Sequence, residues 1–469
     1  RPKFHVTLDA PKEAPRLNDA VRLKGQAMFY TGAAVDGAQV RYRVVREARM
    51  PWWWAFSGRR PGPWIRSPSQ EIAHGSTATG ADGAFAIEFR ASPDRRIPED
   101  DDPRFVFTIY ADVTDNAGET RSARRAVWVG YTALEARVTV EDWQTDTRPV
   151  ELKLRTTTLD DEPQSVKGTV RVCSLKAPKN VQRPSLLGEI VRPGAQDHDQ
   201  ENGGGSDLNR WPVGNVVLKR SFTTDADGNS TVHVLLPAGA YQVAVEAQDR
   251  FGKTVRGWRT ILVVRPQDAT FGTPVPFYLG APKWEVEPGE EFTALWGTGY
   301  ETGRAFVEIE HRGRLLQSYW TRPGETQARI TQAVSEAMRG GFGLRLTFVR
   351  ENRAYLESKH VTVPWTNKRF KLRWEHFTSK LEPNAKETWT AVIETSSGPT
   401  GITASAEGIA AEMVATLYDR SLDQFQSLAW PDSFGVFGQD IRYVLQHFGN
   451  EARHFQTFHD GWCVPHQAV

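Results

Sequence analysis

Two phrases in the first third of the chain decide its fold class: TATGADGAFAIEF at residues 77–89 and FTIYADVTDNAGETRSARRAVWV at residues 107–129. In both, apolar and polar residues alternate, which is the period of a strand with one buried face. The first phrase is interrupted by Ala-Asp-Gly and the second by Asp-Asn-Ala-Gly, so we predict a hairpin turn in each. The two phrases together predict antiparallel strands joined by tight turns.

The same pair of phrases returns later, as FTTDADGNSTVHVLL at 222–236 and YQVAVEAQDRFGKTVRGWRTILV at 241–263. A repeat one domain length away indicates tandem domains rather than a solenoid of short units. A second pattern begins at RLNDAVRLKGQAMFY (16–30), where an Asn-Asp turn introduces an alternating run, and a turn-residue pair introduces a strand again from 286 and from 381.

These repeats predict an all-β chain of tandem β-sandwiches. We predict four domains: residues 1–130 with a Trp-rich loop insertion, 131–265 with a Gly-rich loop, 266–365, and 366–469. One segment, QARITQAVSEAMR at 327–339, has Ile330, Val334 and Met338 at steps of four before two glycines, which predicts a short helix.

Composition narrows the function classes. Lys and Arg number 58 against 57 Asp and Glu, so the net charge of +1 provides no basic field for nucleic acid. No apolar run is long enough to span a membrane. The two cysteines, Cys173 and Cys463, are far apart and fit neither a zinc ribbon nor a redox pair. The chain begins at Arg1 without a signal-like segment, so we expect a processed chain or a piece of a longer one.

Trp52, Trp53 and Trp54 are the most unusual cluster in the sequence. Three consecutive Trp residues cannot all face one core, and stacked aromatic rings can form a platform for a carbohydrate or a peptide. Alternatively, they lie in a long loop and plug the edge of a sandwich or a seam between domains. We treat them as a candidate binding loop.

The sequence offers no convincing metal or catalytic motif. Asp225 and Asp227 resemble the opening of a calcium loop, but Leu236 stands where the closing Glu is needed, so we predict a turn. The acidic run at 99–102 is predicted to be a solvated loop. The histidines fit no zinc motif: His198, His454, His459 and His466. Serine-hydrolase, phosphate-loop and dinucleotide fingerprints are also missing. We therefore predict that the chain is not an enzyme and holds no cofactor or metal.

The stretch AAEMVATLYDRSLDQF at 410–425 can be interpreted in two ways. As a helix it would place Asp419 and Asp423 on one face, and as a strand it would end at a turn that contains both. The stretch resembles the strand-and-turn phrase of bacterial α2-macroglobulins, with these matching positions: Tyr418, Asp419, Ser421 and Leu422. The resemblance favours the strand. The stretches KFHVTLDAP and VRLKGQAMFYTGAAVDGAQVRYRVVRE also resemble a macroglobulin-like domain of that family.

The resemblance implies successive macroglobulin-like sandwiches, which are immunoglobulin- or fibronectin-like, in an exported protein of the periplasm, cell surface or extracellular space. Family members trap proteases after cleavage of a bait segment, and many then bond them through a thioester. This chain departs from that pattern, because Cys173 is followed by Ser-Leu-Lys and Cys463 by Val-Pro-His, and neither is a thioester motif. The family's domain order places the bait at or after residue 423. Residues 395–408 have bait-like composition but are also interpreted as a hairpin loop.

The resemblance thus implies a non-catalytic scaffold region of a broad-spectrum endopeptidase inhibitor. The expected partners are trapped proteases and other domains of a longer parent chain. One alternative is a surface adhesion or carbohydrate-binding array that uses the loop with Trp52, Trp53 and Trp54. Another is an accessory region of a polysaccharide-processing enzyme.

Overall fold

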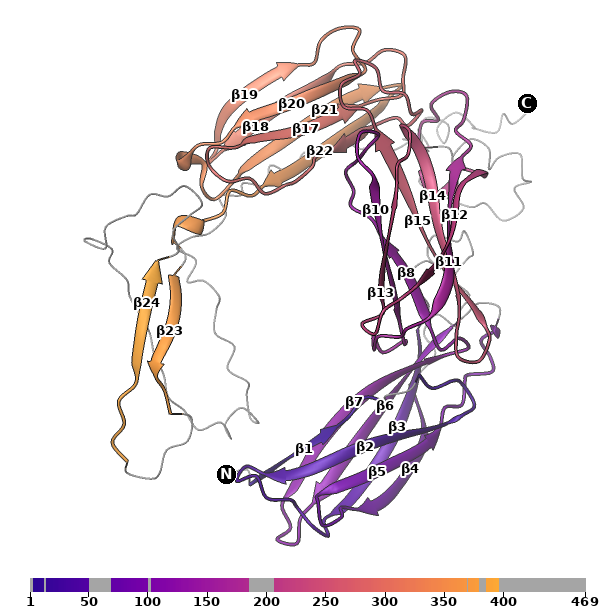
Figure 1. Cartoon of the computed structure of the whole chain (residues 1–469), viewed down its shortest axis with the longest axis vertical. Helices are drawn as coiled ribbons and strands as arrows, with labels where there is room; N and C mark the ends of the chain where they lie inside the picture. Colours follow the sequence, from indigo (N-terminus) through magenta and orange to yellow (C-terminus); the bar gives the residue numbers. More distant parts are fainter. Residues whose placement is uncertain are drawn as a thin grey trace, which may run out of the picture. The chain divides into compact units, whose positions relative to one another are not determined.

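The computed structural model describes residues 3–11, 14–49, 69–99, 103–184, 206–368, 370–378 and 385–395. The described residues fall into two compact units. The first contains those up to residue 175 and those of 213–263, and the second contains those of 176–212 and those from 264 onward. Both units are built of antiparallel sheets (Figure 1), which confirms the all-β sandwich class.

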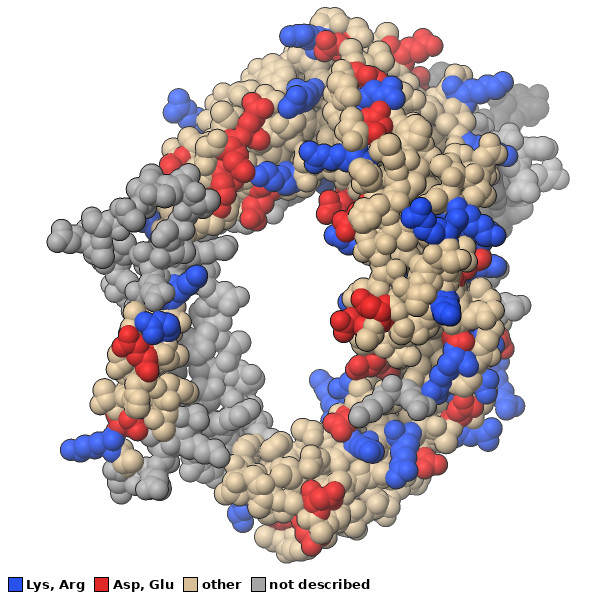
Figure 2. Space-filling view, in the orientation of Figure 1, with Lys and Arg blue, Asp and Glu red and all other residues tan. Residues whose placement is uncertain are grey.

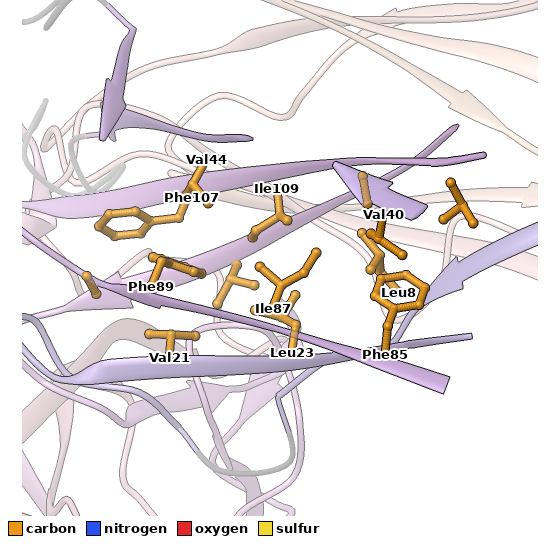
Figure 3. Close-up of a cluster of buried hydrophobic side chains, with 14 of the residues drawn as sticks. Leu8, Val21, Leu23, Val40, Val44, Phe85, Ile87, Phe89, Phe107 and Ile109 are labelled. Carbon is orange, nitrogen blue, oxygen red and sulfur yellow. The ribbon is translucent and has the colours of Figure 1, made fainter. Parts of the chain in front are cut away.

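The first unit opens with a sandwich of two sheets. One sheet has the order β1-β2-β5, with β1 (Phe4–Leu8), β2 (Ala20–Phe29) and β5 (Ala84–Arg90). The other has the order β4-β3-β6-β7, with β4 (Gln70–Ala78), β3 (Gln39–Arg49), β6 (Arg104–Thr114) and β7 (Thr120–Gly130). Alternate residues of both sheets point inward, as Figure 3 shows for Leu23 and Ile87 from one sheet and Val44 and Ile109 from the other. All four are essentially fully buried.

A second sandwich in the same unit has its own core. Its smaller sheet has the order β13-β10-β8, with β13 (Asn229–Val234), β10 (Val150–Thr157) and β8 (Glu135–Thr139). The larger has the order β12-β11-β14-β15-β9, with β12 (Val213–Thr223), β11 (Lys167–Leu175), β14 (Gly239–Gln248), β15 (Thr254–Val264) and β9 (Gln144–Thr145). Leu152, Leu154, Val243 and Val245 are buried between the two sheets.

The duplicated Ala-Asp-Gly phrase forms the same turn in both sandwiches, but not the predicted hairpin. It connects β4 to β5 in the first and β12 to β13 in the second, and in each case the two strands belong to different sheets. The backbone carbonyl of Gly83 accepts a hydrogen bond from the backbone N–H of Ala27 at 2.9 Å, and that of Gly228 accepts one from the backbone N–H of Thr156 at 2.8 Å. The turn therefore lies against β2 in the first sandwich and against β10 in the second, each the neighbour of the strand that follows the turn. The Asp-x-x-Gly turns at 115–118 and 249–252 do form the predicted hairpins, β6–β7 and β14–β15.

The second unit contains a third sandwich. Its sheets have the orders β16-β17-β20 and β19-β18-β21-β22. Their strands are β16 (Tyr278–Gly280), β17 (Glu291–Gly297), β20 (Gln327–Ala333), β19 (Arg314–Trp320), β18 (Ala305–His311), β21 (Phe342–Arg350) and β22 (Arg353–Val361). Its core is aromatic: the ring of Trp296 lies 5.6 Å from that of Phe348, and Phe292 lies 5.6 Å from Phe342.

The predicted helix at 327–339 is wrong. Residues 327–333 form strand β20, which pairs along its whole length with β17, and only Glu336–Met338 form a single turn of 3-10 helix, η5. Ile330, Val334 and Met338 are buried as expected, but their four-residue spacing is satisfied by a strand followed by a turn. The β-branched residues Ile330 and Thr331 favour a strand, and the open edge of β17 provides its partner.

A two-stranded sheet, β23 (Phe370–His376) with β24 (Thr390–Thr395), follows in the second unit. Two further 3-10 turns are η4 (Leu208–Arg210) and η6 (Thr366–Lys368). Among the described residues, no helix is both long and apolar enough to cross a membrane. The predicted domain limits at 130, 265 and 365 stay predictions.

Candidate functional site

Most residues singled out in the sequence lie outside the described part of the chain: Trp52, Trp53, Trp54, Tyr418, Asp419, Ser421 and Leu422. Asp225 lies in a turn, where its Oδ1 accepts a hydrogen bond from the backbone N–H of Asn229 at 2.8 Å. Among the residues that the structure describes, no three His, Cys, Asp or Glu side chains are grouped so as to hold a metal ion. On the face shown in Figure 2, positive and negative side chains are interspersed.

The best-defined polar site is the junction between the two sandwiches of the first unit. It is formed by the short connection between β7 and β8 and by the turns that surround this connection. Four sets of contacts make up this site, which we call the junction: the Asp249 turn, the Asp160 loop, the Glu135 ion pairs and the aromatic rim.

Asp249 links a hairpin turn to the connection. Its Oδ1 accepts hydrogen bonds from the backbone N–H groups of Phe251 and Lys253, each at 2.9 Å, which forms the turn. Its Oδ2 accepts from the backbone N–H of Ala133, in the connection, at 3.0 Å. The equivalent Asp115 of the first sandwich makes the same two turn contacts through Oδ1, to Ala117 and Glu119. In the second copy of the turn, Oδ2 of Asp249 is not needed for the turn itself and binds the connection instead.

Asp160 reaches from the second sandwich to the last strand of the first. It lies in the loop between β10 and β11, and its Oδ1 accepts from the backbone N–H of Trp128 in β7 at 2.9 Å. Burial raises the pKa of Asp160 to about 6, against the opposing effects of the Trp128 hydrogen bond and the charge of Arg125. In the same loop, the side chain of Leu159 packs against Gly130, where a Cβ would come within 2.9 Å of its Cδ1.

Glu135, the first residue of β8, is held between two guanidinium groups. Its Oε2 lies 2.9 Å from Arg104 of β6, and its Oε1 lies 2.7 Å from Arg137 of β8. Burial alone would raise the pKa of Glu135, but hydrogen bonds and charge from the two arginines outweigh it, and the pKa is lowered. The side chain of Glu135 is only 12% exposed, so this ion pair is better shielded from water than an ordinary surface pair.

The aromatic rim surrounds these contacts. The guanidinium of Arg16 lies 4.4 Å from the ring centre of Phe251, and the ammonium of Lys253 lies 5.6 Å from that of Tyr131. Lys253 also pairs with Glu99 at 2.7 Å, so the first residue of the predicted acidic loop takes part in the junction. Both partners of this pair are well exposed, and its contribution to stability is therefore small.

A second polar cluster lies at the end of the third sandwich. Arg339 is only 5% exposed. It binds Glu336 through Nε at 2.7 Å and contacts the carbonyl of Pro364 and the hydroxyl of Thr366. Glu287 approaches it at 3.4 Å. This arginine holds the segment that leaves the sandwich after β22.

The sequence does not predict the junction. The repeated Asp-x-x-Gly phrase predicts a turn, but nothing in the sequence indicates that Oδ2 of Asp249 binds Ala133. Asp160 and Glu135 are single acidic residues in polar stretches, so their partners were visible only after the fold had brought β6, β7 and β8 together.

No protein-family model and no curated protein matches this chain. Among solved structures, it is similar to trypsin-activated alpha-2-macroglobulin from Escherichia coli, with 14% identity, a TM-score of 0.41, and coverage of 85% of this chain and 26% of that one. Salmonella alpha-2-macroglobulin reacted with methylamine matches with 14% identity, a TM-score of 0.29, and coverage of 84% and 25%. A tetra-tandem repeat from a large adhesion protein matches with 13% identity, a TM-score of 0.18, and coverage of 77% and 74%.

The chain spans about a quarter of the length of the alpha-2-macroglobulins that it matches. Identities of 13–14% and TM-scores below 0.5 are too low to decide its activity. What the comparison provides is a structural likeness, over 85% of this chain, to a bacterial alpha-2-macroglobulin.

Proposed function

We propose that the chain is a non-catalytic scaffold region of a bacterial alpha-2-macroglobulin-like, exported inhibitor that traps endopeptidases. Its partners would be the trapped proteases and the other domains of a longer parent chain. The family proposal rests on the sequence phrases at 3–11, 21–47 and 410–425. The scaffold role rests on the architecture of the described sandwiches.

The observation that carries the scaffold role is the junction. Sandwiches in one chain are by default free to move against each other when their interface is small and polar. Here the connection and the last strand of the first sandwich each donate a backbone N–H to a carboxylate of the second, Ala133 to Asp249 and Trp128 to Asp160. Breaking either hydrogen bond would leave a shielded backbone N–H without an acceptor, which lowers the free energy of unfolding by about 1–3 kcal/mol.

A fixed pair of sandwiches suits a protein that must pass a local event on to distant domains. A rigid body transmits a rotation, whereas a flexible connection absorbs it. In a trapping mechanism, cleavage of a bait segment would be the local event, and the sandwiches would move as walls around the protease. In this proposal no residue of the chain performs chemistry on the protease.

The test is limited proteolysis of the chain with trypsin, chymotrypsin and elastase, with the cuts mapped by mass spectrometry and the radius of gyration measured by small-angle scattering before and after cleavage. Trapping predicts that cuts by all three enzymes converge on one short segment outside the three sandwiches and that the radius decreases. Cuts scattered over residues 57–69 and 195–210, with an unchanged radius, would contradict a working bait in this chain.

That second outcome would favour the alternative, an adhesion or carbohydrate-binding array. The tandem sandwiches with a fixed junction suit an extended array equally well, so the architecture alone does not separate the two functions. An array predicts that a carbohydrate or peptide ligand quenches Trp fluorescence. Replacement of Trp52, Trp53 and Trp54 with Ala would then abolish the quenching.

A further inference from the structure

The outer face of the sheet β4-β3-β6-β7 carries an arrangement of arginines that the proposed function does not use. In β3, Val40 and Val44 are buried in the core, so Arg41 and Arg43 point outward. In β7, Val127 and Val129 are buried, which places Arg124 on the same outer face. All three arginines are exposed.

The strand register places two of these arginines on either side of one tyrosine. Arg43 pairs with Tyr110 of β6, and Tyr110 pairs with Arg124 of β7. Three neighbouring strands span about 10 Å, and Arg41 lies about 7 Å from Arg43 along β3. The three arginines therefore outline a triangle on the sheet, with Tyr110 between Arg43 and Arg124. We call this set the arginine face: Arg41, Arg43, Tyr110 and Arg124.

Tyr110 restricts the motion of one arginine. The guanidinium carbon of Arg43 lies 4.3 Å from the centre of the Tyr110 ring, which is a cation–π contact. A guanidinium that stacks on a ring keeps its outer N–H groups free and loses less rotational freedom when it binds an anion. The arginine face is thus partly organised before any ligand arrives.

The arginines of this face have no anionic partner among the described residues, although carboxylates lie nearby. Asp112 pairs in register with Arg41, but it accepts a hydrogen bond from the hydroxyl of Ser122 at 2.5 Å. Glu71 pairs with His74 at 3.1 Å, and Glu47 pairs with Arg49 at 3.0 Å. Asp112 remains exposed and lowers the net charge of the face, which nevertheless stays positive.

The surroundings favour a polar polymer over a protein as the occupant. On the described strands β3, β4, β6 and β7, no large apolar side chain is exposed, whereas protein interfaces are built around a buried apolar centre. Hydroxyl groups lie beside the arginines instead, from Ser76 and Ser122, and both residues are exposed. Guanidinium groups bind carboxylates in pairs of parallel hydrogen bonds, and hydroxyls suit sugar oxygens.

We propose that the arginine face binds a linear anionic polysaccharide whose sugars carry carboxylate groups. Arg43 and Arg124 would each bind one carboxylate, and Arg41 would bind a third or share one with Arg43. This inference is independent of protease trapping, because it concerns a different surface and a different class of ligand.

The probe is polygalacturonate, titrated into the full chain by isothermal calorimetry at low salt, with neutral dextran as the uncharged control. The double variant Arg43→Gln/Arg124→Gln is compared with Arg22→Gln/Lys24→Gln. The control residues are exposed on β2, in the opposite sheet of the same sandwich, and the substitutions remove the same charge. Circular dichroism confirms that both variants are folded.

We expect polygalacturonate to bind the wild type and dextran not to bind. The arginine-face variant should lose roughly tenfold in affinity, since two charge-assisted contacts at an exposed surface are removed, and the control should change by less than about twofold. Tyr110→Leu should weaken binding by an intermediate factor, because it frees Arg43 without removing charge. Affinity should fall as salt is added, with a shallower slope in the double variant.

Three results would overturn the proposal. The first is no binding of polygalacturonate by the wild type. The second is equal loss in the arginine-face and control variants, which would indicate attraction to net charge alone. The third is binding of phosphatidylglycerol vesicles through the same arginines with no binding of polygalacturonate, which would assign the face to a lipid surface.

Discussion

The ionisation of Asp160 should change the free energy of unfolding of the chain. Its pKa is raised to about 6 in the folded chain, whereas its ordinary value is 3.8. Between these two values the unfolded chain loses the proton and the folded chain keeps it, so rising pH favours unfolding. The stability that this group contributes is complete below pH 4 and is lost as the pH rises through 6.

We therefore predict that Asp160→Asn stabilises the chain at pH 7.5 and has little effect at pH 3.5. The amide oxygen still accepts from Trp128, and no charge has to be buried. The full shift corresponds to about 3 kcal/mol, and partial exposure to solvent reduces the expected gain to about 1–2 kcal/mol. Urea unfolding of wild type and variant at the two pH values measures this difference. A gain that is the same at both values would show that burial of the charge is not its cause.

Asp249 and Asp115 form a natural pair for comparison, because they make the same turn in two sandwiches. Asp249→Ala removes the turn contacts and also the acceptor for Ala133, whereas Asp115→Ala removes only turn contacts. We predict that the first substitution costs about 1–3 kcal/mol more than the second, the usual cost of an orphaned buried donor. Hydrogen exchange at Ala133 should accelerate only in Asp249→Ala. Equal costs would mean that the Asp249–Ala133 hydrogen bond does not stabilise the junction.

At the scale of the element, the Ala-Asp-Gly turn depends on its glycine for two reasons. Gly83 and Gly228 have positive φ values of 75° and 74°, and a Cβ on either would come within 2.3 Å of a carbonyl oxygen, that of Ala27 or Thr156. Gly118 in the β6–β7 hairpin also has a positive φ, 83°, but a Cβ there would meet nothing within 4 Å. Substitution of Gly118 would therefore cause backbone strain alone, whereas substitution of Gly83 or Gly228 would cause backbone strain and a steric collision.

We predict that Gly118→Ala costs about 1–2 kcal/mol, the ordinary penalty for a left-handed residue with a Cβ. Gly83→Ala and Gly228→Ala should each cost at least about 3 kcal/mol, because the turn must also move away from the carbonyl of the neighbouring strand, β2 or β10. Urea midpoints of the three variants test this ranking. A cost at Gly83 no larger than that at Gly118 would show that the turn yields without strain.

The strands are easier to predict from the sequence than their arrangement into sheets. Alternation and turn residues correctly predicted strands such as β2 and β3, because one face of each is buried and the period of two is visible in the residues. The sequence does not show which strands share a sheet, and it therefore wrongly predicts hairpins at the turns before β5 and β13. The error at β20 has a related cause: apolar residues at steps of four fit a helix, but also fit a strand followed by a turn.

At the scale of the molecule, the junction should make the first two sandwiches unfold together. Each has a separate core, so without coupling each would unfold at its own urea concentration. The junction links them through Asp249, Asp160 and the Arg104–Glu135 pair. When one sandwich unfolds, the shielded polar groups of the other therefore lose their hydrogen-bond and ion-pair partners. The third sandwich has its own core and is expected to have its own midpoint.

Pulsed hydrogen exchange of the full chain along a urea gradient measures these midpoints by mass spectrometry. In the wild type, peptides from β1–β7 and from β8–β15 should lose protection at one urea concentration. In Asp249→Ala/Arg104→Ala they should separate into two transitions, because two of the three links are removed and the cores themselves are unchanged. Two separate transitions already present in the wild type would mean that the junction is too weak to couple the sandwiches. The scaffold role would then lose its physical basis, since a cleavage signal could not pass from one sandwich to the next as a rigid-body movement.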